Sequence, residues 1–135
     1  MISEFNLIEE AEELWSFLDQ AAVCIHLVGS DGTIHFANQK ELDALGYTAA
    51  EYIGHNITEF HEDQDVIQDI LIRLTNGETL LSYAARLKKK DNSILYVSIN
   101  SNVYKKENNF IHTRCFTSEI NEIAWDCLKN TLDNS

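Results

Sequence analysis

Residues 94 to 104 alternate in character between the two faces of a predicted strand. One face carries Val97, Ile99, Ser101 and Val103, and the other carries Ser98, Asn100 and Asn102. A strand with one mainly apolar face and one polar face is typical of an antiparallel sheet that packs on one side only. This stretch therefore predicts a one-sided sheet with helices on its apolar face.

Four further strands and several short helices complete the expected layout. Residues 21–28 (AAVCIHLV) and 33–37 form a hairpin around an Asp31-Gly32 turn, and two more strands are expected over about 80–89 and 109–118. Between residues 38 and 76 the pattern is helical but broken into short pieces, the last being an amphipathic helix over 63–74. We predict an α+β fold, a five-stranded antiparallel sheet with short helices on one face.

Helices are expected at both ends of this core. Residues 1–20 form an N-terminal amphipathic helix, residues 21–121 form the core, and residues 122–135 begin a C-terminal linker helix. A chain of 135 residues has room for one such domain with a real core, but not comfortably for two.

Charge and composition exclude several function classes. Acidic residues outnumber basic ones 22 to 10, giving a net charge of −12 that repels phosphate backbones and anionic lipid, so no nucleic-acid partner is expected. No stretch approaches the roughly 20 apolar residues of a membrane span. Three cysteines without a framework spacing predict free thiols in a reducing, cytoplasmic location.

Five short motifs, in this order and at these spacings, resemble the PAS domain family over roughly residues 19 to 121. The motifs are DGTIHFAN (31–38), LGYTAAEYIG (45–54), RLTNGE (73–78), KDNSILYV (90–97) and TSEIN (117–121). The last stands where the family usually has Asp-Ile-Thr, and this departure falls at the exit that commonly carries the signal onward.

The resemblance implies a sensory or dimerisation module of a signalling protein, with no catalysis of its own. Such domains bind a small molecule between sheet and helices, form homodimers through flanking helices, and control a histidine kinase or a cyclic-dinucleotide enzyme. No such output domain lies in this sequence, so the chain is expected to be either a lone PAS protein or, as we favour, a fragment whose output domain follows Ser135. A glycine-rich phosphate loop and a motif around a nucleophile are also absent, which agrees with a non-enzyme.

The sequence requires no cofactor. In the light-oxygen-voltage subgroup a cysteine follows the helix asparagine and bonds to flavin, but here Ile57 follows Asn56. Haem-binding members typically use a histidine on the long helix, and residues 63–74 contain none; His61 lies just before them. A metal site is not expected either, because His55 and His61 are six residues apart and do not share a helical face.

The predicted ligand-binding residues lie on the helix-facing side of the sheet and at its rim. They are Asn38, Asn56, Tyr83, Val97, Ile99, Ser101, Thr113, Cys115 and Thr117. An apolar lining with a few hydroxyls is typical of a small-molecule pocket, but it is equally typical of a filled core in a ligand-free interaction domain. A haem or flavin sensor is a third alternative. For Asn38 and Asn56 the other interpretation is that each caps a short helix.

The predicted interface lies on the other face of the sheet. That face carries two arginines, Arg86 and Arg114, in an acidic chain, so we expect the glutamate-rich first helix to pack on it, from the same chain or from a neighbour. Trp15 would then lie near Phe116. The candidate interface residues are Phe5, Ile8, Trp15, Leu18, Arg114 and Phe116.

Overall fold

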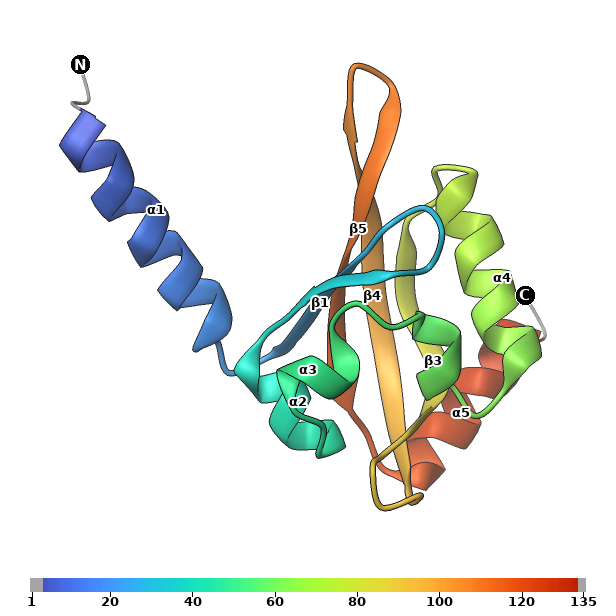
Figure 1. Ribbon diagram of the computed structural model, residues 1–135. Helices are drawn as coiled ribbons and strands as arrows, with labels where there is room; N and C mark the ends of the chain where they lie inside the picture. Colours follow the sequence, from blue (N-terminus) through green and yellow to red (C-terminus); the bar gives the residue numbers. More distant parts are fainter. Residues whose placement is uncertain (1–3, 134–135) are drawn as a thin grey trace.

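A computed structural model describes the backbone of residues 4–133 and the side chains of residues 9–131 (Figure 1). Along the chain, the helices and strands are α1 (Glu4–Asp19), β1 (Cys24–Val28), β2 (Ile34–Ala37), α2 (Gln39–Leu45), α3 (Ala49–Tyr52), the 3₁₀ helix η1 (Ile57–Phe60), α4 (Gln64–Thr75), β3 (Leu80–Lys88), β4 (Ile94–Lys106), β5 (Asn109–Glu119) and α5 (Glu122–Asp133). Within this part of the chain, no helix is long and apolar enough to cross a membrane.

The five strands form one antiparallel sheet in the order β2-β1-β5-β4-β3. The first and last strands in sequence are therefore neighbours in its centre, where His26 lies opposite Cys115 and Cys24 lies opposite Thr117. This pairing brings the two ends of the core together. The predicted α+β fold with a five-stranded antiparallel sheet is confirmed.

Local capping explains why the segment between β2 and β3 breaks into short helices. Asn38 caps α2, Thr48 forms a capping box with Glu51 at α3, and Asn56 caps η1. The β1–β2 turn packs against the last of these caps. A side chain at Gly32, which has a φ of +89°, would come within 2.9 Å of the Asn56 amide, so this turn needs glycine.

The core lies between the sheet and helices α2, α3, η1 and α4. Ala85, Leu87 and the six predicted inward-facing residues from Val97 to Thr117 are buried, while Tyr83 is half-buried, so the predicted orientation of the sheet is correct. The apolar residues of η1 and α4 fill the space opposite them, among them Ile57, Phe60, Ile67, Ile70 and Leu74.

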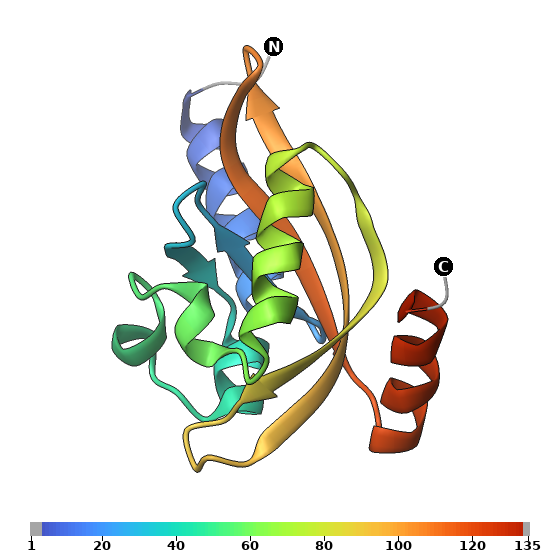
Figure 2. The same ribbon diagram turned by 90° about the vertical axis from the view of Figure 1, so that its right-hand side faces the viewer.

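The helix that packs on the outer face within this chain is α5, on the opposite side of the sheet from α2–α4 (Figure 2). The Trp125 ring meets the Tyr96 ring edge-on, with centroids 5.4 Å apart, and the Arg86 guanidinium lies 5.4 Å from the centre of the same indole. These contacts hold α5 over β3 and β4.

The first helix, α1, extends away from the sheet (Figure 1). The expectation that it packs on its own sheet is therefore wrong for the single chain. Trp15 remains 60% exposed and Phe116 42% exposed. Within the chain it is α5 that covers part of this face, because its Trp125 ring contacts Tyr96 and Arg86 there. Packing on a neighbour's sheet stays a prediction.

Candidate functional site

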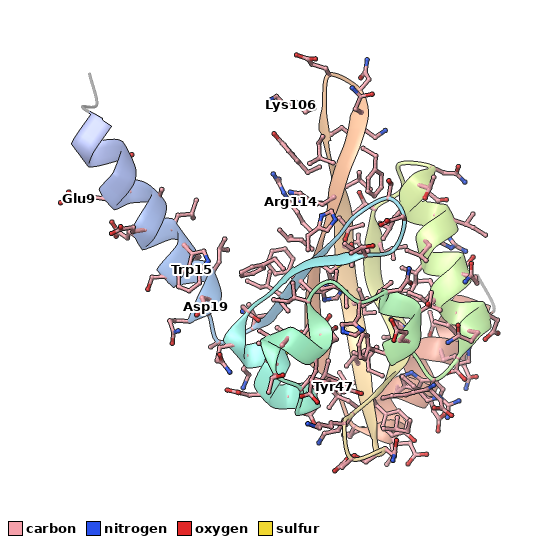
Figure 3. The ribbon with its side chains drawn as sticks, viewed as in Figure 1. Glu9, Trp15, Asp19, Tyr47, Lys106 and Arg114 are labelled. Atoms are coloured by element: carbon pink, nitrogen blue, oxygen red, sulfur yellow. The ribbon has the colours of Figure 1, made fainter. Side chains whose placement is uncertain are left out.

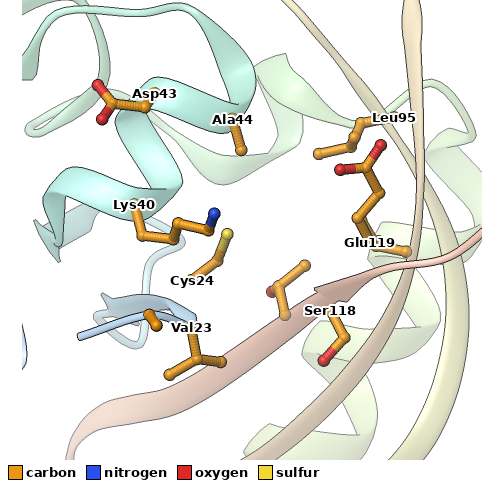
Figure 4. A pocket seen from close by; sticks show the side chains of 11 residues that line it. Val23, Cys24, Lys40, Asp43, Ala44, Leu95, Ser118 and Glu119 are labelled. Carbon is orange, nitrogen blue, oxygen red and sulfur yellow. The ribbon is translucent and has the colours of Figure 1, made fainter.

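A pocket of about 460 Å³ opens beside α2, between the start of β1 and the end of β5 (Figure 4). Two of the predicted ligand-binding residues, Val97 and Thr117, line it. Lys40 from α2 and Glu119 from β5 lie on opposite sides of it. The remaining lining residues are Ala22, Val23, Cys24, Asp43, Ala44, Leu95 and Ser118.

Four other predicted residues, Ile99, Ser101, Thr113 and Cys115, lie deeper on the same face and are buried. Tyr83 is at the far edge, where its hydroxyl donates a hydrogen bond to Asp69 of α4. The structure thus brings the predicted set onto one face, but only two of its members reach the pocket.

Asn38 and Asn56 serve as helix caps, as the second interpretation of them predicts. The Asn38 amide is fully buried and donates to the carbonyl oxygens of Leu18 (2.9 Å) and Val23 (2.8 Å), while its oxygen accepts from Ile25 N (3.0 Å). Asn56 accepts from Thr58 N and donates to the Asp31 carbonyl oxygen. Their polar atoms are occupied by protein partners.

Sequence reasoning missed a buried ion pair between β1 and α2. His26 Nδ1 lies 2.8 Å from Glu41 Oε1, and the two residues are 6% and 1% exposed. Burial opposes a charge on His26, but the Glu41 carboxylate and Cys115 outweigh it and raise the pKa of His26 well above its usual value. A signal for this pair was present, because His26 alternates inward with Cys24 and Val28, and a histidine on a buried face needs a partner.

The thiol of Cys115 lies next to this ion pair, because Cys115 is directly opposite His26 on β5. Cys115 Sγ lies 2.8 Å from Ser101 Oγ and 3.2 Å from Thr113 Oγ1. Burial raises the pKa of this thiol, but the charge of His26 and hydrogen bonds from His26, Ser101 and Thr113 outweigh burial and lower it overall.

Three buried polar atoms near this cluster have no hydrogen-bond partner: Glu41 Oε2, His61 Nδ1 and Thr117 Oγ1. Burial lowers the pKa of His61 to about 3, with a further contribution from the charge of His26, so the ring is neutral around pH 7. An unpartnered buried polar group costs about 1–3 kcal/mol. Of the three residues, Thr117 also lines the pocket.

Among the described side chains, no three from His, Cys, Asp and Glu are grouped so that they could hold a metal ion. His61, the histidine considered for haem, is only 2% exposed, and it does not line the pocket. His112 lies on the outer face, tilted against the Tyr104 ring, and Cys115 lies on the inner face.

Comparison with known proteins settles the family. A family model for the PAS domain matches residues 21–122. The chain belongs to the PAS family. No curated protein matches it significantly.

Solved PAS structures share the fold of this PAS domain. The PAS domain of an HTR-like protein from Haloarcula marismortui has a TM-score of 0.76 at 24% identity, covering 87% of this chain and 97% of that one. A PAS domain from a two-component sensor histidine kinase has a TM-score of 0.71 at 14% identity, covering 84% and 99%. A light-oxygen-voltage domain gives 0.76 at 20% identity, covering 91% and 96%. PAS domains are typically sensory modules without catalysis.

Proposed function

We propose that this PAS domain is the cytoplasmic sensory module of a signal-transduction protein and that it binds a small molecule in the pocket beside α2. The observation that carries the proposal is the pocket itself, about 460 Å³ in volume with the unpartnered Thr117 hydroxyl in its wall. Sites for small molecules occupy about 300–1,000 Å³ and combine apolar walls with a few polar groups. Leu95 and Val97 supply such a wall, and Lys40 and Glu119 supply charges on either side.

The ligand-free alternative is favoured by the packing under η1 and α4. There the rings of Tyr47, Tyr52 and Phe60 pack together, with Tyr52 and Phe60 centroids 4.7 Å apart, and Tyr52 is only 1% exposed. This half of the interior is a filled core. A ligand in this protein therefore sits beside α2 and not under α4.

Blocking the pocket is expected to abolish ligand binding. In Ala44→Trp the indole occupies the pocket from α2, while the matched Ala50→Trp places the same side chain on the exposed surface of α3. Native mass spectrometry of freshly purified protein should show extra, non-covalent mass on the parent chain and on Ala50→Trp, and none on Ala44→Trp.

The same three samples also test the ligand-free alternative and the placement of the chain outside the light-oxygen-voltage subgroup. Bare mass on all three proteins would establish the ligand-free interaction domain instead. Because Ile57 stands where the light-oxygen-voltage subgroup has its reactive cysteine, we place the chain outside that subgroup. An absorbance band above the aromatic region would contradict this placement.

We further propose that the domain forms a homodimer in which α1 of one copy covers the outer sheet face of the other. Three large apolar side chains on α1 are uncovered, with Leu14 60%, Trp15 60% and Phe17 70% exposed. Exposed apolar patches of this kind mark interaction sites. On the sheet, Phe116 and Arg114 are also exposed, and the acidic face of α1 complements the arginine (Figure 3). Downstream, α5 would lead to a histidine kinase or cyclic-dinucleotide enzyme.

Reversing the charge of Arg114 is expected to weaken the dimer at least tenfold. Arg114 lies on the exposed part of the outer face, stacked 4.4 Å from the Tyr104 ring centre, so Arg114→Glu places a carboxylate against the acidic helix. Analytical ultracentrifugation measures the dissociation constant. Lys106→Glu, with the same charge change at the hairpin tip, should leave it unchanged. Equal dissociation constants for the Arg114 variant and the parent would refute this interface.

A further inference from the structure

The cluster around Cys115 has the components of an activated thiol. The Glu41 carboxylate lies 2.8 Å from His26 Nδ1 and accepts its hydrogen bond, and Cys115 lies directly opposite His26 on β5. A carboxylate that orients an imidazole toward a thiol is the arrangement that generates a thiolate nucleophile.

Two hydroxyls complete the surroundings of the sulfur. The backbone N–H of Val28 donates to Thr113 Oγ1 at 3.1 Å, and the thiol of Cys115 donates to the same oxygen at 3.2 Å. The Ser101 hydroxyl lies 2.8 Å from the same sulfur. Hydroxyls from β4 and β5 therefore lie beside one sulfur atom, and both can donate to it once it has lost its proton.

The cluster lies directly behind the pocket wall. Thr117 and Cys24 line the pocket, and Cys115 and His26 are the next inward-facing residues on the same two strands, about 7 Å further along. The Thr117 hydroxyl, 2% exposed and without a partner, lies between the pocket and the sulfur along β5. Since Cys115 itself is 4% exposed, only a very small reagent can reach it.

We propose that Cys115 is an oxidation site for small hydroperoxides, which enter through the pocket beside α2. The thiolate sulfur attacks the terminal peroxide oxygen, so that an S–O bond forms and the O–O bond breaks. Sulfur is oxidised by two electrons and the hydroperoxide is reduced. The departing alkoxide or hydroxide takes the proton from His26 Nε2, which yields sulfenic acid on Cys115 and an alcohol or water.

Oxidation of Cys115 would displace neighbouring side chains, and β5 connects this position to α5. The added oxygen must fit among Ser101, Thr113 and His26, where packing leaves no room without movement. β5 runs from Cys115 to Glu119 and then into α5. The proposed oxidation of Cys115 rests on the proposed function in one respect, that the hydroperoxide enters through the same pocket beside α2.

The test uses the Cys24→Ser/Cys127→Ser variant, in which Cys115 is the one thiol left. The folded protein is treated with hydrogen peroxide, the excess peroxide is removed, and the protein is then unfolded in urea with dimedone, which traps the sulfenic acid once Cys115 is accessible. The groups that face Cys115 are His26, Glu41 beyond it, Cys24 and Tyr52. We expect a dimedone adduct on Cys115 that forms less pH-dependently between about pH 6 and about pH 8 than the adduct on Cys127, because Ser101, Thr113 and His26 surround the sulfur and favour the thiolate. The exposed Cys127, alone in Cys24→Ser/Cys115→Ser, is the matched thiol outside the cluster.

Two further measurements separate activation from simple exposure. Glu41→Gln and the milder Ser101→Ala, made in the same background, should slow the labelling of Cys115 at least tenfold and threefold, while their unfolding curves confirm that they are folded. Labelling that rises when urea below the unfolding transition is present during the peroxide step, or that follows the pH profile of Cys127, would overturn the proposal. An empty pocket in native mass spectrometry would refute the ligand but not this oxidation, since the reaction needs no bound ligand.

Discussion

Glu41→Ala is expected to lower the free energy of unfolding by about 3–5 kcal/mol, the usual cost of removing one partner from a buried ion pair. Both partners are more than 90% buried, and Cys115 lies directly opposite His26 on β5. Without the Glu41 carboxylate, the His26 ring would either lose its proton inside the core or remain charged without its closest counterion. Urea unfolding followed by circular dichroism measures the loss.

The matched control for this prediction is Asp43→Ala, on the same helix. Asp43 is exposed and accepts a hydrogen bond from Gln39, so its removal should change the free energy of unfolding by no more than about 0.5 kcal/mol. Replacing both members of the pair, in His26→Leu/Glu41→Leu, should recover most of the stability, because buried ion pairs can be exchanged for well-packed apolar residues. A Glu41→Ala protein as stable as Asp43→Ala would mean that the pair does not form.

The second large effect is a loss of stability in mild acid that depends on His61. The folded-state pKa of His61 is about 3, against 6.5 for the free side chain, so between these values the unfolded chain binds a proton that the folded protein resists. The contribution of His61 to stability is therefore complete well above pH 6.5 and is lost as the pH drops. Its slope approaches about 1.4 kcal/mol per pH unit, which gives about 2 kcal/mol from pH 6.5 to about pH 4.5.

Other groups do not obscure this window. The folded-state pKa of His26 is raised, so below pH 6.5 the residue is protonated in both states and contributes a constant amount. Asp63 and Asp69 have lowered pKa values, and their contributions are lost only as the pH falls below about 4.

His61→Leu is expected to remove this slope, because leucine has a similar volume and the lost Nδ1 atom has no partner. His55→Leu makes the same substitution on the surface nearby and should keep the slope. Both are measured by urea unfolding at a series of pH values. If the slope survives in His61→Leu, the ring is not buried in its neutral form.

Local rules account for the elements that could be predicted from the sequence. The strands expected over about 80–89, 94–104 and 109–118 are found as Leu80–Lys88, Ile94–Lys106 and Asn109–Glu119. Alternation in the strands and turn residues between them depend on neighbours a few positions away, and these are visible in a single sequence. The caps at Thr48 and Asn56 follow for the same reason.

The polar cluster could not be predicted because it is assembled across the sheet. Glu41 looks like an ordinary first-turn carboxylate of a helix until α2 is placed on β1, and His26 meets Cys115 only because the first and last strands pair. The sequence predicts that Asn38 can cap a helix. Its hydrogen bonds to the carbonyl oxygens of Leu18 and Val23 cannot be predicted, because they depend on the path of the chain before β1.

The strands, the short capped helices and the buried face of the sheet follow from the sequence alone, since each depends on local periodicity and turn chemistry. Which helix covers the outer face, where the pocket opens and which buried charges meet depend on how these elements pack in three dimensions. Periodicity shows that a helix has an apolar side but not which surface it will contact. For that reason α5 and not α1 lies on the sheet, and the ion pair of His26 and Glu41 became visible only in three dimensions.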